Sequence, residues 1–592
     1  MKIKKNPKKF WGYVKSLKSS RNTPREMIYN NEILTDSVAI ATAFNAFFKS
    51  VFKPLTFLSS LSNYLLSFIS DIYDVPIFHI PFIDSDQMKN QILMLNPNTS
   101  SGYEKLSVTF LINCADDLCV PLSILFNMCI EKGQYPDILK KCNITPIFKN
   151  KGVKEDVINY RGISIEPIIS KLFQSLVKKH LIAHIERLVS PDQHGFLPGR
   201  STTTNLTCYQ DFISTQLDLK NQVHAVYTDF QKAFDVVPHD LLIKKLYCNF
   251  GFRDNVLLFF HSFLSNRFQR VVINGVESQW TSVTSGVPQG SILGPLLFIM
   301  YINDVSSVFK FSKCLLFADD AKIFKSISNI SDCIELQTDL NSFQNWCTEW
   351  KLYLNLDKCL VMNFSLKKCH NIVFSYCLHG FTLPYEIEVK DLGVYFTPKL
   401  NFKRHVSYIV SKAFKMLGFM NRVTKPFTDE TVLRTLYFSY VRSRLEYCSQ
   451  VWAPTAQIYV NTIERVQRKF IKKLCFLKNI NYDTNDYLLN CDYFRIQPLS
   501  ARRNVADIVF FNKILTQKIN CSTLVSEILL YAPERPLRRN ISRSTFYVKC
   551  RTCTRKESFM PRVMTLLNNH NCIDCFIEST AVLKRTAYTV FF

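Results

Sequence analysis

Two adjacent acidic residues lie between two apolar runs in the middle of the chain. Residues 315–324 read LLFADDAKIF, so one apolar run leads into Asp319 and Asp320 and a second run follows them. Short apolar runs bounded by turn signals are typical of buried strands, which places the two aspartates at the tip of a hairpin. Adjacent carboxylates repel each other, so this position is unfavourable unless solvent or a cation compensates. The segment therefore predicts a buried sheet with an acidic edge.

Two further segments share this mixture of apolar runs and polar turns. Residues 225–235 read AVYTDFQKAFD, so Asp229 stands where another predicted strand ends, although it would equally serve as the cap of a following helix. Asp235 is expected to have a local role there, or to pair with a basic neighbour. Residues 285–295 read SGVPQGSILGP, in which glycine, proline and Gln289 precede a helical pattern. Such a loop brings backbone close to a ligand at a helix N-terminus, but taken alone it is more typical of a tight turn.

Phosphoryl transfer between nucleotides is a reaction that would use these segments together. The reaction is an in-line displacement at phosphorus, in which charge grows on the attacking and the leaving oxygens. Two divalent ions about 4 Å apart stabilise both oxygens, and carboxylates at strand ends are suitable ligands for them. We therefore expect Asp229, Asp319 and Asp320 to form a metal-binding catalytic site.

The charge balance of the whole chain favours a polyanionic partner. The 592 residues include 73 Lys and Arg against 48 Asp and Glu, a formal net charge of +25, and nucleic acid is the commonest partner of so basic a protein. Near the N-terminus lysines alternate with Phe10, Trp11 and Tyr13, a pattern that suits a nucleic-acid-binding arm and a solvated helix face about equally. The length predicts several packed sub-domains, and the 47% of hydrophobic residues argues against extended disorder.

The same composition argues against export and membrane insertion. The 20 cysteines are scattered and the N-terminus has no apolar core segment, so reduced thiols in an intracellular protein are expected. No apolar run reaches the roughly 18 residues that a membrane span needs. The most apolar early stretch, 55–69, is interrupted by polar residues and predicts a buried or amphipathic helix.

The coarse architecture is α+β, a catalytic middle between helical flanks. Strand-like runs alternate with the helical patterns of 240–249 and 293–302, and Asn274-Gly275 between two β-rich runs predicts a hairpin. Apolar residues recur at helical spacing in 84–127, and after about residue 400 the pattern is again helical, with basic faces.

The chain resembles the reverse transcriptases of non-LTR (LINE-type) retrotransposons, most closely the jockey-like group, over nearly its whole length. Besides the three segments above, the matching motifs are PIFKNKG (146–152), NYRGIS (159–164), SKLFQSLV (170–177), DQHGFLPGRST (192–202), WKLYLNLDKC (350–359), VKDLGVYFTPKLNF (389–402), VRSRLEYCSQVWAP (441–454) and IERVQRKF (463–470). The resemblance implies a right-hand polymerase fold of fingers, palm and thumb with an antiparallel palm sheet. The expected divisions are a basic N-terminal extension (1–115), fingers and palm (116–400), a helical thumb (401–480) and a C-terminal helical extension (481–592).

The resemblance also implies a role for each matching residue. Asp229 and Asp319 match the metal-binding aspartates and Asp320 the third acid, and they would hold two Mg²⁺ ions, with Mn²⁺ as a possible substitute. The nucleotide-binding positions are the triphosphate-gripping Lys149 and Arg161, Phe234, which excludes a 2′-hydroxyl, and Gln289, which contacts the incoming nucleotide. Lys358 matches a lysine proposed to protonate the leaving pyrophosphate, although a surface lysine is an equally good reading. Residues 389–393 match the hairpin that holds the primer end.

The partners implied are an RNA template, a DNA primer or target and dNTPs, without a membrane, and the oligomeric state is open. Action in the nucleus is expected by analogy with the family. The family usually encodes an upstream endonuclease of the apurinic type, and no such segment is present in this sequence. We therefore expect that the chain begins in the linker just before the polymerase, as a truncated element copy or a fragmentary gene model would. Gly162 replaces the proline common in NYRGIS, with little expected effect.

Two alternative functions and one candidate metal site remain open at this point. A catalytically silent remnant would bind nucleic acid without turnover, and an intron-type maturase is disfavoured by the segment at 441–454. The spacing of Cys550 and Cys553 with Cys572 and Cys575 is that of a zinc ribbon. Their strand-like and apolar surroundings argue against zinc, and the resembling family offers no metal site there.

Overall fold

A four-stranded antiparallel sheet carries the acidic segments. In the computed structural model its strand order is β11 (Leu360–Phe364), β5 (Gln222–Thr228), β10 (Asp320–Ile327) and β9 (Lys313–Phe317). Each neighbouring pair is antiparallel, with Ala321 opposite Thr228 and Asp320 opposite Phe317. The predicted strands and the predicted acidic hairpin are therefore confirmed.

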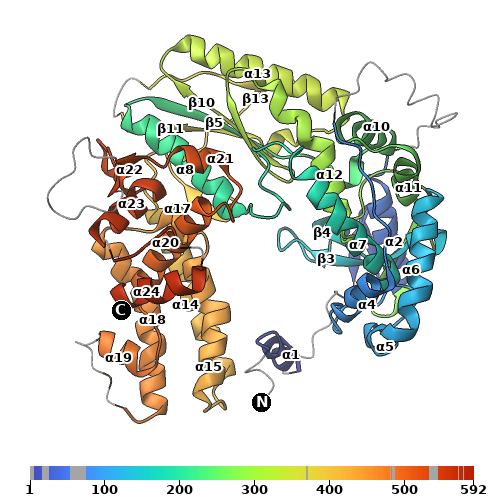
Figure 1. Cartoon of the computed structure of the whole chain (residues 1–592), viewed down its shortest axis with the longest axis horizontal. Coiled ribbons are helices and arrows are strands. Elements are labelled where there is room, and N and C mark those ends of the chain that lie inside the picture. The colour runs from blue at the N-terminus through green and yellow to red at the C-terminus, as the bar shows by residue number, and fades with distance from the viewer. Residues whose placement is uncertain are drawn as a thin grey trace.

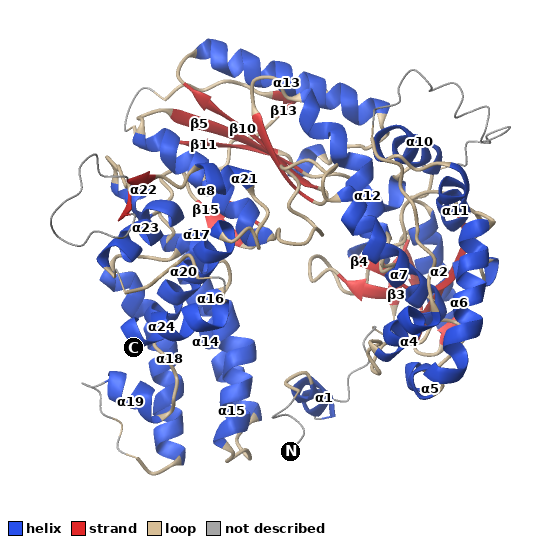
Figure 2. Ribbon diagram, in the orientation of Figure 1, coloured by secondary structure: helices blue, strands red, loops and turns tan. Residues whose placement is uncertain are grey.

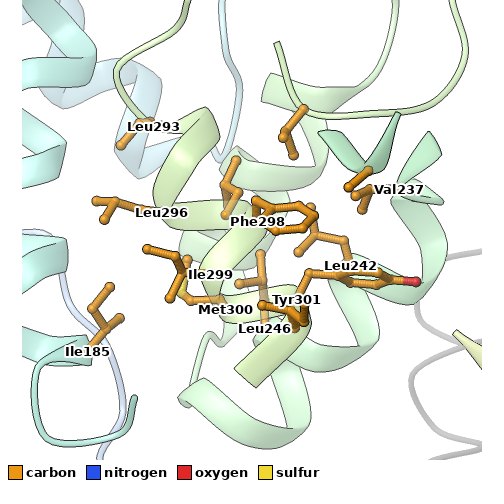
Figure 3. Packing of buried hydrophobic residues seen from close by; sticks show 14 of the residues in the cluster. Ile185, Val237, Leu242, Leu246, Leu293, Leu296, Phe298, Ile299, Met300 and Tyr301 are labelled. Atoms are coloured by element: carbon orange, nitrogen blue, oxygen red, sulfur yellow. The ribbon is translucent and has the colours of Figure 1, made fainter. Parts of the chain in front are cut away.

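Both faces of this sheet are buried, which explains why its strands read as continuous apolar runs. Val226, Ile323 and Val361 belong to a core shared with helices α12 (Gly294–Ile302) and α13 (Ile330–Glu349). Ala225, Phe324 and Met362, each one residue along its strand from these, belong to a second core shared with α8 (Thr202–Asp218) and the C-terminal helices. Successive side chains of a strand point to opposite faces, so the alternation assigns each residue to its core. Figure 3 shows Phe298 and Tyr301 of α12 on the side facing Leu242 and Leu246 of α10 (His239–Phe250), whereas Ile299 lies on the side nearer Ile185.

A second, five-stranded sheet lies in the N-terminal half. Its path is β4 (Tyr160–Ile165), β3 (Lys141–Phe148), β6 (Arg267–Ile273) and β7 (Val276–Glu277), and β8 (Thr281–Val283) also pairs with β6. The β3–β6 pairing is parallel and the others are antiparallel. The predicted Asn274-Gly275 hairpin joins β6 to β7, and the positive φ angles of both residues (52° and 85°) suit a tight hairpin turn.

The remaining elements are mostly helices. The N-terminal part contains β1 (Met27–Tyr29), β2 (Glu32–Leu34), α2 (Ser37–Lys49), α4 (Ser85–Leu93), α5 (Val108–Asn113), α6 (Ala115–Glu131), η2 (Asp137–Lys140), η3 (Val157–Asn159), α7 (Ile168–Ile185), α9 (Ala233–Val236) and α11 (Asp254–Leu264). Between the sheet and the C-terminal helices lie η4 (Asn303–Val308), η5 (Leu356–Lys358), β12 (Cys377–Leu378), β13 (Phe381–Thr382), β14 (Val389–Asp391) and β15 (Val394–Phe396). The C-terminal part contains α14 (Lys403–Val423), α15 (Glu430–Tyr437), η6 (Phe438–Arg442), α16 (Ser443–Glu446), α17 (Ser449–Trp452), α18 (Gln457–Leu477), α19 (Tyr487–Tyr493), α20 (Leu499–Leu515), α21 (Ser522–Ser526), β16 (Leu530–Tyr531), β17 (Thr545–Phe546), α22 (Cys553–Glu557), α23 (Phe559–Asn569) and α24 (Thr580–Phe591).

The two groups of helices lie on opposite sides of the molecule, joined by the four-stranded sheet and α13 (Figure 1). Figure 2 shows the strands gathered in that joining region and in the N-terminal sheet, whereas the C-terminal side is almost entirely helical. Helix α1 (Lys9–Ser16) is N-terminal in sequence, yet Phe10 and Trp11 pack on Phe419 and Tyr440 of the C-terminal helices. Those two aromatics of the predicted nucleic-acid arm thus have a packing role.

The structure describes residues 6–16, 24, 26–53, 75–367, 371–480, 482, 487–531, 545–570, 572–577 and 579–591. The helix predicted at 55–69 and several lysines of the N-terminal arm lie outside these residues. The mixed α+β class with antiparallel sheets is confirmed. Over the described ranges no helix combines the length and the apolarity that crossing a bilayer requires.

Candidate active site

Strand pairing brings the three predicted catalytic aspartates to one edge of the four-stranded sheet. Asp229 directly follows β5, and Asp319 and Asp320 lie at the β9–β10 turn. Because Ala321 pairs with Thr228, continuing the antiparallel register places Asp320 across from Asp229. The Thr228 hydroxyl donates a hydrogen bond of 3.1 Å to the Ala321 carbonyl and helps to hold the two strands together here. We call Asp229, Asp319 and Asp320 the acidic edge.

The acidic edge concentrates negative charge on two half-buried side chains, Asp229 and Asp319, and one exposed side chain, Asp320. Burial raises the pKa of Asp319, and the charge of Asp229 raises it further. Burial together with the charges of Asp319, Asp391 and Asp229 raises the pKa of Asp320 to about 6. A divalent cation would relieve this repulsion, and carboxylate oxygens are the hard ligands that Mg²⁺ and Mn²⁺ prefer, so the donor set fits such an ion.

Lys358 provides the cation that meets the acidic edge in this structure. It ends η5, and its Nζ lies 2.7 Å from Oδ2 of Asp229. Asn355, which the sequence reasoning missed, donates its backbone N–H to the Asp229 carbonyl over 2.7 Å and its side-chain amide to Oδ2 over 3.3 Å. Searched over the described ranges, only His194, Cys208 and Cys521 place three ligand atoms within 4.8 Å of one another, so the acidic edge is more open than a closed metal site.

The β9–β10 turn, which carries Asp319, is held by a residue without an assigned role in the sequence reasoning. Ala318 adopts a left-handed conformation (φ 57°), which a non-glycine residue needs support to maintain. The buried Gln193 side chain accepts hydrogen bonds from the N–H groups of Ala318 and Gly195, over 2.9 and 2.8 Å. A Cβ on Gly195 would lie 2.5 Å from the Ala318 nitrogen, so glycine is required for this approach. The signal available in the sequence was the matching motif DQHGFLPGRST, in which both residues stand.

Four of the other predicted site residues lie around or beside one cavity of about 240 Å³. Lys149, Arg161 and Gln289 line it, together with Lys232 and Asp235, and Phe47 and Phe48 of α2 contribute from the N-terminal segment. We call Lys149, Arg161 and Lys232 with this space the cationic cavity. Phe234 precedes Asp235, and its ring stacks on Phe298 of α12 with centroids 4.3 Å apart. Its position is thus fixed by the buried core beneath it.

Positive charge is crowded in the cationic cavity. Burial lowers the pKa of Lys149, and the charges of Lys232, Arg161 and Lys358 lower it further. Burial also lowers the pKa of Lys232. Cations held this close favour a polyanion such as a triphosphate, which would offset their repulsion.

The loop carrying Gln289 is fixed on both sides. The Gln289 amide donates to Oδ1 of Asp235 over 3.0 Å, which gives Asp235 a local role. The Ser164 N–H donates to the Gln289 carbonyl over 2.8 Å, and Gly290 (φ 116°) passes so close that a Cβ would lie 2.4 Å from the Ser164 carbonyl oxygen. This contact ties the loop to β4, which also carries Arg161. A Cβ on Gly162 would lie 2.8 Å from the Ile144 side chain, so the glycine at this position fits its close packing.

The β14–β15 hairpin, predicted to hold the primer end, is attached to the catalytic strand. Lys322 of β10 forms a buried ion pair with Asp391 of β14. The Lys322 ammonium also lies over the Tyr209 ring, 4.5 Å from its centroid. Sequence reasoning missed this pair because nothing local links Lys322 to a carboxylate so far along the chain.

The cysteines with zinc-ribbon spacing do not form a cluster of three ligand atoms in the part of the chain that the structure covers. Cys553 and Cys572 are exposed, whereas Cys575 is buried. The Asn512 amide donates to the Cys575 carbonyl over 2.9 Å, so this segment packs against α20.

An acidic strand edge beside a cationic cavity is an arrangement that metal-dependent nucleotidyl transfer could use. Residues 147–420, which include every predicted site residue, match the family model described as "Reverse transcriptase (RNA-dependent DNA polymerase)". Over this segment the chain is therefore similar to reverse transcriptase domains.

Curated relatives agree with the predicted resemblance. The chain is 26% identical over 403 residues to "RNA-directed DNA polymerase from mobile element jockey" of Drosophila melanogaster, covering 66% of this chain and 43% of that protein. It is 28% identical over 365 residues to "Probable RNA-directed DNA polymerase from transposon BS" of the same organism, covering 60% and 40%. The resemblance to jockey-like elements is thus confirmed, and the chain spans less than half the length of these relatives.

Proposed function

We propose that this chain is an RNA-directed DNA polymerase of a non-LTR retrotransposon, which extends a primer 3′-hydroxyl on an RNA template with dNTPs. The observation that carries the proposal is the acidic edge beside the cationic cavity, within the segment that is similar to reverse transcriptase domains. The names of the relatives support the same activity.

Each predicted residue has a place in this mechanism. Asp229, Asp319 and Asp320 would hold two Mg²⁺ ions, or Mn²⁺, which stabilise charge on the attacking and leaving oxygens. Lys149 and Arg161 would bind the triphosphate by charge-assisted hydrogen bonds. The Gln289 amide orients the nucleotide, and the Phe234 ring excludes a 2′-hydroxyl. Lys358, already at Asp229, would supply a proton to pyrophosphate.

The arrangement is consistent with a right-hand polymerase. In this proposal residues 116–400 form fingers and palm, the helical residues 401–480 form the thumb, and residues 481–592 form an extension, whose described part packs on α8 and the thumb. The 1–115 extension also adds to the site, because Phe47 and Phe48 line the cationic cavity. The net charge of +25 suits an RNA template and a DNA primer or target, and the family analogy would place the reaction in the nucleus.

The test is primer extension by the full chain on an RNA template with a DNA primer, dNTPs and Mg²⁺. Asp319→Asn is the active-site variant, and Asp116→Asn is the matched control because its carboxylate is exposed and pairs with Lys89 far from the site. We expect extension by the parent and Asp116→Asn but not by Asp319→Asn. A folded parent that binds primer–template without extending it would instead identify a silent nucleic-acid-binding remnant.

A further inference from the structure

Three buried metal-ligand side chains from distant parts of the chain meet behind the catalytic strands. His194, Cys208 and Cys521 are each less than 9% exposed, and one ligand atom of each lies within 4.8 Å of the other two. The two sulfurs are 3.3 Å apart although 313 positions separate the residues in sequence. The ligands of a tetrahedral Zn²⁺ lie about 2.0 Å (nitrogen) and 2.3 Å (sulfur) from the ion, so such a group needs little movement to close around one.

Hydrogen bonding assigns the tautomer of His194. The Thr204 hydroxyl donates its hydrogen to the Ser201 carbonyl over 2.8 Å, so its oxygen acts as acceptor toward Nδ1 of His194, also 2.8 Å away. Nδ1 therefore carries the proton and Nε2 keeps a free lone pair. A neutral imidazole whose second nitrogen is held by a hydrogen bond is the form in which histidine binds metals.

The two thiols form a close pair of soft donor atoms. The Cys208 and Cys521 sulfurs lie within hydrogen-bonding distance of each other, and both side chains are buried. Thiolates are the ligands that Zn²⁺ selects, and two of them neutralise its charge in a buried place.

The group joins three elements that the proposed reaction needs in place. His194 follows Gln193, which holds the β9–β10 turn, and its N–H donates to the Leu316 carbonyl of β9 over 2.9 Å. Cys208 lies on α8, and Cys521 immediately precedes α21 in the C-terminal extension. The same extension also holds α8 through the Arg555–Asp211 ion pair at 2.5 Å.

From this juxtaposition we infer that His194, Cys208 and Cys521 form a zinc site that fastens the C-terminal extension to the back of the catalytic sheet. Binding replaces the two thiol protons, which pass to solvent, by two Zn–S bonds, and Nε2 of His194 supplies the third ligand. A water molecule is left for the fourth position. This site is separate from the acidic edge, whose oxygen ligands suit Mg²⁺.

Metal content of the full-length chain, without any activity assay, tests the site. The purified protein is dialysed against a weak chelator, and bound zinc is measured by mass spectrometry. Cobalt is then substituted to record the near-ultraviolet thiolate-to-cobalt band. We expect one zinc per chain, and loss of both signals in Cys208→Ser and Cys521→Ser. Thr204→Val, which removes the support of His194, should weaken zinc binding about 10- to 100-fold.

Two controls separate this site from other thiols. Cys475→Ser removes a buried thiol of α18 outside the group, and a second variant replaces Cys550, Cys553, Cys572 and Cys575 by serine; both should retain the metal. Because a variant can fail to fold, alkylation mapping of the parent gives an independent reading, with Cys208 and Cys521 protected until a strong chelator removes zinc. A folded parent without metal, loss of metal only in the fourfold variant, or a Cys208–Cys521 disulfide in the metal-free protein would each overturn the inference.

Discussion

The acidic edge and the cationic cavity are built on the same electrostatic principle with opposite signs. In each, burial is the first cause of the shifted pKa values and like charges are a further cause, which raises the pKa of Asp319 and lowers that of Lys149. Each region also contains one group of the opposite sign, Lys358 at the edge and Asp235 in the cavity. Like charges that the fold holds close together favour binding of a ligand of the opposite charge. The edge is therefore suited to cations and the cavity to a polyanion.

The largest effect should come from removing a charge at the acidic edge. Asp319→Asn keeps the size of the side chain but removes a ligand charge, so we expect primer extension to fall at least about 100- to 1,000-fold. Single-turnover extension measures this loss, and retained binding of labelled primer–template controls for the fold. Extension by Asp319→Asn at the parent rate would contradict a catalytic role for the acidic edge.

The next largest effect should be a change of substrate selectivity at Phe234, the residue directly before Asp235 of the cavity lining. Phe234→Ala removes a ring seated on Phe298, which opens space beside the proposed sugar position. The preference for dNTPs over rNTPs should fall about 10- to 100-fold, in the range of a steric pocket contact. The ratio of kcat/KM for the two substrates measures it in the same preparation, and an unchanged ratio would contradict the proposed role.

A smaller effect is expected from removing one cation of the cavity. Arg161→Ala should raise KM for dNTPs about 10-fold, since a hydrogen bond between charged groups contributes about 1.5 kcal/mol or more, with kcat nearly unchanged. Steady-state kinetics with each variant tests this split. Lys154→Ala is the matched control, because Lys154 is an exposed cation that is not among the residues lining the cavity. Equal effects of both substitutions would show that the cavity contributes only general positive charge and no specific contact with the nucleotide.

The smallest effect concerns the opposite charge inside the cavity. Burial raises the pKa of Asp235 to about 6, so the folded protein binds more protons than the unfolded chain between about pH 4 and 6. The parent therefore loses stability as the pH rises through that window. Asp235→Asn should avoid this loss, with a gain of about 1 kcal/mol at pH 7 that disappears near pH 4. Urea unfolding at several pH values measures it, and a gain independent of pH would argue against this titration.

Much of the fold and site could be predicted because their signals are local. Apolar runs and turn residues predicted β5, β9, β10 and the Asn274-Gly275 hairpin, and motif order predicted the three aspartates. Gln193, Asn355 and the Lys322–Asp391 pair were missed, because their roles depend on partners far along the chain. The cysteines show the same limit. The spacing of Cys550 and Cys553 with Cys572 and Cys575 is that of a zinc ribbon, although their surroundings argued against zinc, while the close group of ligand atoms joins His194, Cys208 and Cys521.

The sequence by itself determined the chemistry available to this protein: acids at strand ends, cations in the matching motifs, and a charge balance suited to nucleic acid. These depend on short-range periodicity, turn conformations and residue type. Only the tertiary structure decided which of them meet, since the β5–β10 pairing sets Asp229 opposite Asp320 and packing of the C-terminal extension sets Cys521 against Cys208. The reason is physical: burial of the two sheet faces specifies the strand register, and no local pattern encodes which distant surfaces must cover them.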